Sequence, residues 1–418
     1  MTTKYPRKKP RRSLVLALSV ILFATVFLLP FLNSGHADSV VATVRVGSVP
    51  QGIAFDSANG NIYVADSNGS AVSVISGSTN TVIATVPVGG SPTSVACDPS
   101  NGDIYVTNGG SYVSIISGST NTVIATLGGL DGAFGVAFDS SNGNIYIADP
   151  AQTGADAFYV ISGTTNTITA SITGNQTFLW NPVELAFDSS NGDIYSTSAI
   201  GGLIVIFGSS VTANVLGGIG FNYLAFDPAN GNIYASDRVS SVVHVIAGTT
   251  DKIVANITVG GSNFEVRSPT EGIAFDSGTG NIYVASQVEN VSVISGDTNV
   301  VIANVTGIEA PQEVAYDSAN GDVYVTSSLN IVYVISPSSV PISSSSSSTT
   351  TSSSASVTSS STSASVTSSP TSTSTSGGGI PEFPPELIAA VVLTLVVVLS
   401  YVAMKRLATL TKSRARDS

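Results

Sequence analysis

The sequence predicts an all-β fold, a seven-bladed β-propeller, from a phrase that recurs seven times, from its spacing, and from a spare strand at one end. The phrase is an apolar residue, alanine, a residue that is usually aromatic, aspartate, a short polar stretch with glycine, and an aliphatic residue followed by tyrosine. Copies are 39 to 49 residues apart and alternate as strands do, which is typical of propeller blades rather than helical solenoids. The repeated aspartates are Asp56, Asp98, Asp139, Asp188, Asp227, Asp276 and Asp317.

Each copy contains four strand-like segments, a to d, which in the first copy cover 52–56, 61–66, 71–76 and 81–88. Strands a and b are joined by a turn from Asp56 to Gly60. Aspartate bonds its own backbone in such turns, and Asn-Gly tolerates the positive φ of a tight hairpin. We therefore interpret the seven aspartates as turn caps rather than as a ring of metal ligands.

Closure of the ring is predicted from the two ends of the repeat region. The seventh copy stops after its third strand, 331–336, and no d strand follows. The segment 40–47 closely resembles 82–89, which contains the first d strand. We expect this segment to complete the last blade, which closes the circle at seven blades without exposed edges.

The ends of the chain predict export and anchoring. Residues 1–37 have the basic start, apolar stretch and small polar end of a signal peptide, with cleavage before Asp38; an uncleaved anchor is the alternative. The propeller is expected over 38–337 and a solvated Ser/Thr-rich stalk over 338–379. Residues 380–404 hold a sorting motif and an apolar transmembrane helix, and 405–418 a basic tail. The positive-inside rule places this tail in the cytoplasm and the propeller at the cell surface.

The charge of the exported region limits its partners. Between Asp38 and Glu386 there are 26 acidic and four basic residues, a formal charge of −22. Such a surface repels phosphate backbones, so no nucleic-acid partner is expected. We expect a protein or glycan of the cell envelope or extracellular space, besides the membrane contacted by the C-terminal helix.

Two motifs resemble known families. Tyr105-Val106-Thr107-Asn108 spells the tetrapeptide of the YVTN family of β-propeller repeats, and the resemblance covers residues 40–336. It implies a secreted or surface-layer-type archaeal propeller without shared catalytic residues. The segment around Pro381-Glu382-Phe383 resembles the archaeal PEFG sorting signal, although Pro384 stands where that motif has glycine. Both processing by a sortase-like enzyme and a retained helix stay open.

The ligand face is predicted from loop length. The a–b turn has constant length, whereas long d–a and b–c loops occur in the third copy and a long d–a loop in the fifth. Function on repeat scaffolds tends to lie on such insertions. We expect the d–a/b–c face to bind the ligand, with Gln51 at its mouth. The further candidates, for which loop packing is the alternative role, are Phe134, Phe178, Trp180, Glu184, Phe264, Glu271 and Glu313.

The residue inventory favours a non-enzymatic binding, adhesion or surface-layer module. His244 is the single histidine after the signal and Cys97 the single cysteine, so no Ser/His/Asp, Cys/His or nitrogen-rich metal site is expected. No cofactor is expected; the alternative is calcium bound by carboxylates at the mouth. The alternative is an exported lactonase-like hydrolase or lyase, or a quinoprotein-like oxidoreductase, because fold does not decide function. Glycosylation candidates are Asn68, Asn175, Asn256, Asn290 and Asn304.

Overall fold

A computed structural model describes residues 38–150, 157–173, 182–198, 201–215, 220–259, 270–287 and 290–337. The predicted signal, stalk, sorting segment and transmembrane helix lie outside these residues. Within the described ranges, none of the chain forms a helix with the length and hydropathy needed to cross a bilayer. In the same ranges, one 3₁₀ turn, η1 (Ser67–Gly69), accompanies the strands.

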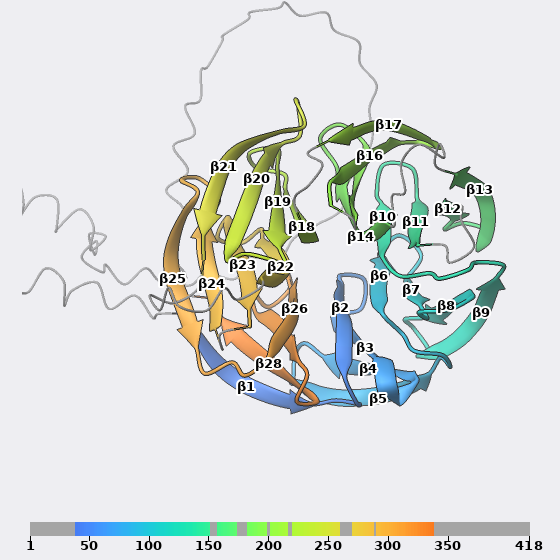
Figure 1. The fold of residues 1–418 in the computed structure, drawn as a ribbon. Helices are drawn as coiled ribbons and strands as arrows, with labels where there is room; N and C mark the ends of the chain where they lie inside the picture. The colour runs from blue at the N-terminus through green and yellow to red at the C-terminus, as the bar shows by residue number, and fades with distance from the viewer. Residues whose placement is uncertain are drawn as a thin grey trace, which may run out of the picture. The chain divides into compact units, whose positions relative to one another are not determined.

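The described strands form seven antiparallel sheets of four strands each. In Figure 1 the a strands surround the centre of the ring and the d strands lie on its outside. The a strands are β2 (Pro50–Asp56), β6 (Ser94–Asp98), β10 (Val136–Asp139), β14 (Pro182–Asp188), β18 (Phe221–Asp227), β22 (Thr270–Asp276) and β26 (Pro311–Tyr316). The b strands are β3 (Asn61–Asp66), β7 (Asp103–Thr107), β11 (Asn144–Asp149), β15 (Asp193–Ser198), β19 (Asn232–Asp237), β23 (Asn281–Ser286) and β27 (Val323–Ser327).

The outer half of each blade consists of strands c and d. The c strands are β4 (Ala71–Ser76), β8 (Tyr112–Ser117), β12 (Ala157–Ser162), β16 (Leu203–Phe207), β20 (Val242–Ala247), β24 (Asn290–Ser295) and β28 (Ile331–Ser336). The d strands are β5 (Thr81–Pro87), β9 (Thr122–Gly128), β13 (Thr167–Thr173), β17 (Ser210–Val215), β21 (Lys252–Thr258), β25 (Val300–Thr306) and, from the start of the described chain, β1 (Ser39–Arg45).

The predicted closure is confirmed. Strand β1 pairs antiparallel with β28, with Ser39 opposite Ser336 and Arg45 opposite Ile331, and completes the sheet β1-β28-β27-β26. Val44 of β1 is buried in the cluster between the last and first blades, and Val40 packs against the cluster between blades six and seven. Figure 1 shows β1 on the outside of the ring beside β28. The first strand of the chain therefore supplies the outer edge of the last blade.

The repeated aspartates cap the a–b turns, as the sequence predicts. In every blade one carboxylate oxygen accepts a hydrogen bond from the backbone N–H two residues later, at 2.7 to 2.9 Å; in the first blade Ala58 donates to Asp56. The glycine two residues further on has a positive φ, as at Gly60 (73°). Local turn chemistry thus sets the register of the two inner strands.

The repeated tyrosines join each blade to the next on the a–b/c–d face. The hydroxyl of Tyr105, for example, donates to Oδ1 of Asn166 in the following c–d turn at 2.5 Å. Equivalent bonds run from Tyr63 to Asn121, Tyr195 to Asp251, Tyr234 to Asn299 and Tyr324 to Asn80. All five acceptor residues have a φ near +53°, the left-handed region that Asn and Asp tolerate.

The tyrosine contact between the sixth and seventh blades uses a residue at the start of the described chain. The c–d turn is absent from the seventh blade, and Tyr283 of the sixth donates instead to Asp38 Oδ2 at 2.8 Å. The c–d turn of the fourth blade is shorter, and there Tyr146 of the third blade donates to the carbonyl of Gly208 at 3.0 Å. One face of the ring is therefore occupied by the same structural contact from blade to blade.

Each d strand contains a β-bulge at the same position, and the bulged residue lies outside the ladder with strand c. In blades three and four this residue is Thr169 or Thr212, whose hydroxyl donates to the carbonyl of Val160 or Val205 at 3.1 or 3.2 Å. In the other five blades it is aliphatic and about half exposed, as at Val254. The bulged residues are Val41, Ile83, Ile124, Thr169, Thr212, Val254 and Ile302.

We expect Val254→Thr to stabilise the protein, because the new hydroxyl can donate to the carbonyl of Val245 as in blades three and four, while an exposed apolar side chain is removed. The free energy of unfolding should rise by about 0.5 to 1 kcal/mol, which urea denaturation can measure. Val254→Ala is the matched control, since it removes apolar area without adding a donor. Equal stability of the two variants would show that the hydroxyl contributes nothing.

Candidate functional site

The centre of the d–a/b–c face is built from one position of the repeat, four residues before each aspartate. We call these seven residues the axial ring: Gly52, Ser94, Gly135, Glu184, Tyr223, Gly272 and Glu313. Six of them lie within an a strand, and Gly135 immediately precedes β10. Three members are glycine and one is serine, so the long polar side chains come from blades four, five and seven. The axial ring is therefore asymmetric in chemistry although the fold is repetitive.

The glycines of the axial ring are required by packing between blades. A Cβ atom on Gly52 would lie 2.6 Å from the Cα atom of Ser94, and one on Gly135 or Gly272 would clash with the backbone beside Glu184 or Glu313. Neighbouring a strands can approach this closely only where the side chain is absent. Both glutamates thus stand next to a glycine, on a strand drawn against the preceding blade.

The blades without an axial glycine use a hydroxyl instead. The N–H of Glu184 donates to Thr197 Oγ1 at 3.1 Å, and the N–H of Glu313 donates to Thr326 Oγ1 at 2.9 Å. Thr326 also donates to the carbonyl of Gln51 in the next blade at 3.1 Å. In blades one, three and six, where the axial residue is glycine, the residue equivalent to Thr326 is alanine. This pairing holds the backbone of both glutamates in place.

Glu184 and Glu313 interact electrostatically, although they belong to blades four and seven. Two residues that far apart around the circle interact only if both side chains reach toward the axis. Glu184 is 8% exposed, and burial raises its pKa to about 8. Burial, and then the neighbouring Glu184 carboxyl, raise the pKa of Glu313 well above its usual range.

Tyr223 lies among the carboxyls. Burial raises the pKa of its phenol, and the charges of Glu313, Glu184 and Glu271 raise it further. Glu271 precedes the axial position, and burial raises its pKa as well. Its two carboxylate oxygens accept hydrogen bonds from Asn222 Nδ2 at 2.9 Å and Gln287 Nε2 at 2.6 Å. Glu271 is therefore held at the rim, whereas Glu184 and Glu313 reach inward.

The structure brings together part of the predicted site. Glu184, Glu271 and Glu313 share the mouth with Tyr223, while Phe134 is partly buried and its carbonyl accepts bonds from Thr93 and Thr107. Phe178, Trp180 and Phe264 lie outside the described residues. Tyr223, Asn222 and Gln287 were not among the sequence candidates. Aligning the seven copies on their aspartates would have revealed Tyr223, because it occupies the same repeat position as the two buried glutamates.

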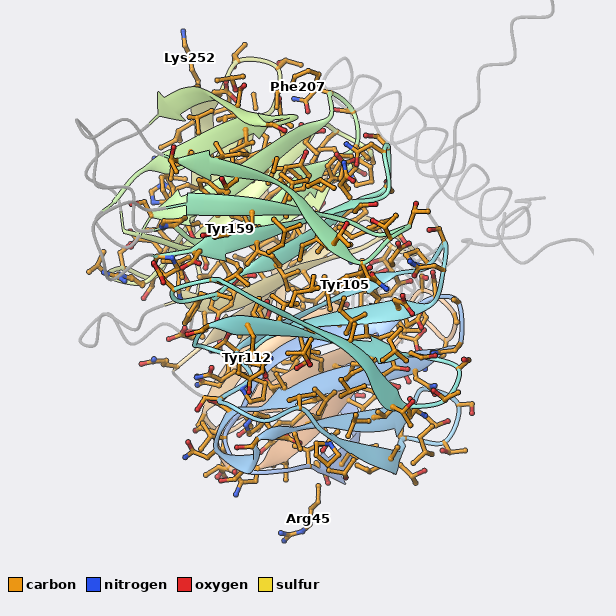
Figure 2. All side chains as sticks on the ribbon, turned by 90° about the vertical axis from the view of Figure 1, so that its right-hand side faces the viewer. Arg45, Tyr105, Tyr112, Tyr159, Phe207 and Lys252 are labelled. Carbon is orange, nitrogen blue, oxygen red and sulfur yellow. The ribbon has the colours of Figure 1, made fainter. Side chains whose placement is uncertain are left out.

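Basic side chains are absent from the electrostatic neighbours that act on these carboxyls in the described part of the chain. Arg45 and Lys252 lie on the outer strands β1 and β21, and Figure 2 shows both pointing away from the body of the ring. Across the same residues, no group of three or more His, Cys, Asp or Glu side chains is placed to hold a metal ion. The mouth is thus acidic, and no counter-charge from these two residues reaches it.

His244 is engaged within blade five. It is 9% exposed, its Nδ1 lies 2.6 Å from Oδ1 of Asn256, and its Nε2 lies 3.6 Å from Asp237 Oδ2. Its ring packs edge-on against Phe221 at a centroid distance of 5.4 Å. These contacts are those of a packed core histidine on strand β20.

The glycosylation candidates differ in accessibility. Asn68, Asn256 and Asn304 are exposed, whereas Asn290 is 5% exposed and Asn175 lies outside the described residues. Oδ1 of Asn304 accepts a hydrogen bond from Ser292 at 2.7 Å, and Oδ1 of Asn256 contacts His244, so the outer strands of blades five and six orient both amides. The folded protein presents three of the candidates to solvent.

Comparisons with known proteins agree with this architecture. The NHL repeat family matches residues 48–75, which is the part of the first blade from before β2 to β4. No curated protein matches the sequence. Among solved structures, the chain is similar to hydrazine synthase of Kuenenia stuttgartiensis, with a TM-score of 0.60 and 16% identity over 69% of this chain and 95% of that one. At that identity the likeness shows the fold alone. The chain is a β-propeller repeat protein with seven blades.

Proposed function

We propose that this chain is a surface-anchored propeller that acts as a non-enzymatic binding module and recognises a protein or glycan of the cell envelope or extracellular space through its d–a/b–c face. The observation that carries the proposal is the difference between the two faces. The a–b/c–d face is occupied by one repeated tyrosine contact, whereas the mouth of the other face varies from blade to blade. Variation on a repetitive scaffold is where binding specificity is usually found.

The position of the chain ends supports the same proposal. Strand β28 ends at Ser336 and strand β1 begins at Ser39, directly opposite each other, on the a–b/c–d side. The predicted stalk therefore starts on the side opposite Glu271 and Glu313. Anchoring through a C-terminal helix would leave the mouth free to meet a partner. The YVTN and PEFG resemblances fit an exported, archaeal surface protein, and glycosylation or a surface-layer role belongs to the same proposal.

The alternative is a hydrolase or lyase that uses carboxyl groups, and one observation favours it. The buried pair Glu184 and Glu313 has raised pKa values, as acid–base pairs in enzymes do. The engaged state of His244 gives no support to a histidine-dependent mechanism. A hydrolase screen with and without calcium tests this alternative. Turnover that is abolished by Glu271→Gln would show that the protein is an enzyme.

The binding function is tested with glycan arrays and with pull-downs from envelope extracts, using the purified full chain. We expect capture of a defined component, and we expect Glu271→Gln to weaken it at least tenfold. Asp297→Asn is the matched control, because Asp297 is an exposed acid in the c–d turn of the same blade, on the opposite face. Equal loss in both variants would point to general charge rather than to the d–a/b–c face.

A further inference from the structure

Asparagine followed by glycine is among the chemically least stable pairs in a protein, and the sequence contains eight such pairs. The asparagines are Asn59, Asn68, Asn101, Asn108, Asn142, Asn191, Asn230 and Asn320. The backbone nitrogen of the glycine can attack the side-chain amide carbon of the asparagine, because glycine has no side chain that hinders the approach. Hydrogen bonds that hold the amide and the backbone in place suppress this attack in a folded protein. The contacts at each pair therefore decide which asparagine reacts.

Six of the pairs lie in the a–b turns, where both ends of the asparagine amide are held. Oδ1 of Asn101, for example, accepts a hydrogen bond from the N–H of Asp103 at 2.7 Å, and Nδ2 donates to the carbonyl of Gly163 in the next blade at 2.9 Å. The N–H of Gly102, whose nitrogen would be the nucleophile, donates to the carbonyl of Asp98 at 2.8 Å. The amide and the attacking nitrogen are thus both engaged in this turn.

The other a–b turns and one buried pair are held in similar ways. The a–b turns repeat these bonds, except that Nδ2 of Asn142 donates to Oδ2 of Asp139 in its own turn at 2.6 Å. Asn108 is 1% exposed, and its Nδ2 donates to the carbonyl of Val106 at 3.2 Å and to Ser114 Oγ at 3.0 Å. Cyclisation at any of these seven asparagines requires that hydrogen bonds to other residues break first.

Asn68 is held less firmly than the other seven. It lies in the 3₁₀ turn η1, in the connection between β3 and β4, and its side chain is exposed. Its backbone N–H donates to the carbonyl of Ser48 at 3.1 Å, but within the described ranges no hydrogen bond holds its amide oxygen or nitrogen. A short 3₁₀ turn at the surface has weaker hydrogen bonds than an α-helix and opens at little cost in free energy. The Asn68 amide can therefore reach the next nitrogen without first losing side-chain bonds.

We propose that Asn68 is the preferred site of spontaneous deamidation in the folded protein. The backbone nitrogen of Gly69 bonds to Cγ of Asn68, the bond from Cγ to Nδ2 breaks, and Nδ2 leaves as ammonia with the proton that the Gly69 nitrogen gives up. Water then opens the cyclic imide at either of its carbonyls and leaves aspartate or isoaspartate at position 68. Water is the co-reactant, and no electrons are transferred. The inference stands apart from the proposed function, since no ligand or partner takes part.

The reaction changes the d–a/b–c face, because the β3–β4 connection is a b–c loop. Either product adds a negative charge there, and isoaspartate also lengthens the backbone before Ser70. The carbonyl of Ser70 accepts hydrogen bonds from the N–H groups of Val88 and Gly89, each at 3.1 Å. Its hydroxyl donates to the carbonyl of Gly90 at 2.7 Å. Isoaspartate at position 68 therefore disturbs the contacts between the b–c and d–a loops of blade one.

Peptide mapping by mass spectrometry tests the inference. The purified full chain, produced in a host without N-glycosylation so that Asn68 carries no sugar, is kept at neutral pH for increasing times, and deamidation is measured at all eight pairs. We expect Asn68 to react at least about tenfold faster than any other pair, because the hydrogen bonds lost on opening slow the others by about that factor. In urea-unfolded chain the eight pairs should react at similar rates, which shows that the fold causes the difference.

Gly69→Ala is the matched variant, because it keeps Asn68 but places a methyl group beside the attacking nitrogen. A Cβ atom on Gly69 would lie 3.1 Å from Cβ of Asp66 and 3.5 Å from the nitrogen of Ser48, so a small shift accommodates it. This variant should lose most of the deamidated product over the same time. Unchanged deamidation in Gly69→Ala would refute cyclisation, and reaction at Asn68 no faster than at another pair of the folded protein would overturn the inference.

Urea unfolding tests the effect on blade one. Wild-type protein that has deamidated should be less stable than freshly prepared Asn68→Asp, because the variant adds the charge without lengthening the backbone. Equal stability of the two would refute the effect of isoaspartate on the loops of blade one.

Discussion

Deletion of residues 38–46 is expected to abolish cooperative folding of the propeller. Strand β28 would lose its partner over the six aligned residue pairs between Ser39 and Arg45, and the cores on either side of blade seven would lose Val40 and Val44. Tyr283 would also lose its acceptor, Asp38. At about 1 kcal/mol per hydrogen bond and about 2 kcal/mol per buried valine, the loss is on the order of 5 to 10 kcal/mol. That equals the whole stability of a typical domain.

Circular dichroism during urea unfolding measures this loss, with the undeleted chain as reference. A synthetic peptide of residues 38–46 should restore the cooperative transition in a concentration-dependent way, because it supplies the missing d strand in trans. The same peptide carrying Val44→Asp is the control, since it keeps the backbone donors but places a charge in a buried position. An unchanged unfolding curve after the deletion would show that β1 does not hold the ring closed.

Stability of the wild-type protein is expected to fall as pH rises from about 4.5 to about 8, and Glu184→Gln should remove part of that fall. The folded state raises the pKa of Glu184 from 4.5 to about 8 because the buried carboxyl resists ionisation. Below pH 4.5 the group is protonated in both states and carries no penalty. Between the two values the unfolded chain releases its proton while the folded protein retains it, so unfolding becomes progressively easier. Above about pH 8 the difference is constant.

The size of the effect follows from the shift, at about 1.4 kcal/mol per pKa unit, and is on the order of 5 kcal/mol for Glu184. Urea titrations at pH 4.5, 6 and 8 compare the wild type, Glu184→Gln and Glu309→Gln. Glu309→Gln should follow the wild type, because its carboxyl is exposed. Other buried carboxyls with raised pKa values keep a residual slope in Glu184→Gln; they include Glu313, Glu271 and Asp66, whose pKa burial raises to about 6. If the free energy of unfolding changed with pH in the same way in all three proteins, the burial of Glu184 would not be the cause of the pH dependence.

The deletion of residues 38–46 and the pH titration test two different features of the propeller. Closure depends on contacts that every blade repeats, so its loss is structural and affects the whole ring. The axial carboxyls occupy positions where blades differ, and their raised pKa values lead us to expect that they lower stability at neutral pH. Side chains kept at a cost to stability are often functional. This is the physical basis for placing the proposed binding site there rather than on the repeated tyrosines.

The sequence by itself determined the strand order, the turn chemistry and the closure at seven blades. Those features depend on local rules: alternation within strands, Asp caps at fixed spacing, Asn-Gly turns, and the likeness of 40–47 to 82–89. The candidates Glu184, Glu271 and Glu313 lie near the start of the a strands β14, β22 and β26, and their role as ligand residues stays a prediction.

Only the tertiary structure decided which of these residues meet. Glu184 and Glu313 are 129 positions apart in the chain, and their interaction arises because the ring brings blades four and seven to a common axis. The same geometry placed Tyr223 among them, left Glu271 bonded at the rim, and turned Asp38 into the acceptor of a tyrosine from another blade. Strand periodicity carries no information about such contacts, because they depend on how seven sheets close around one centre.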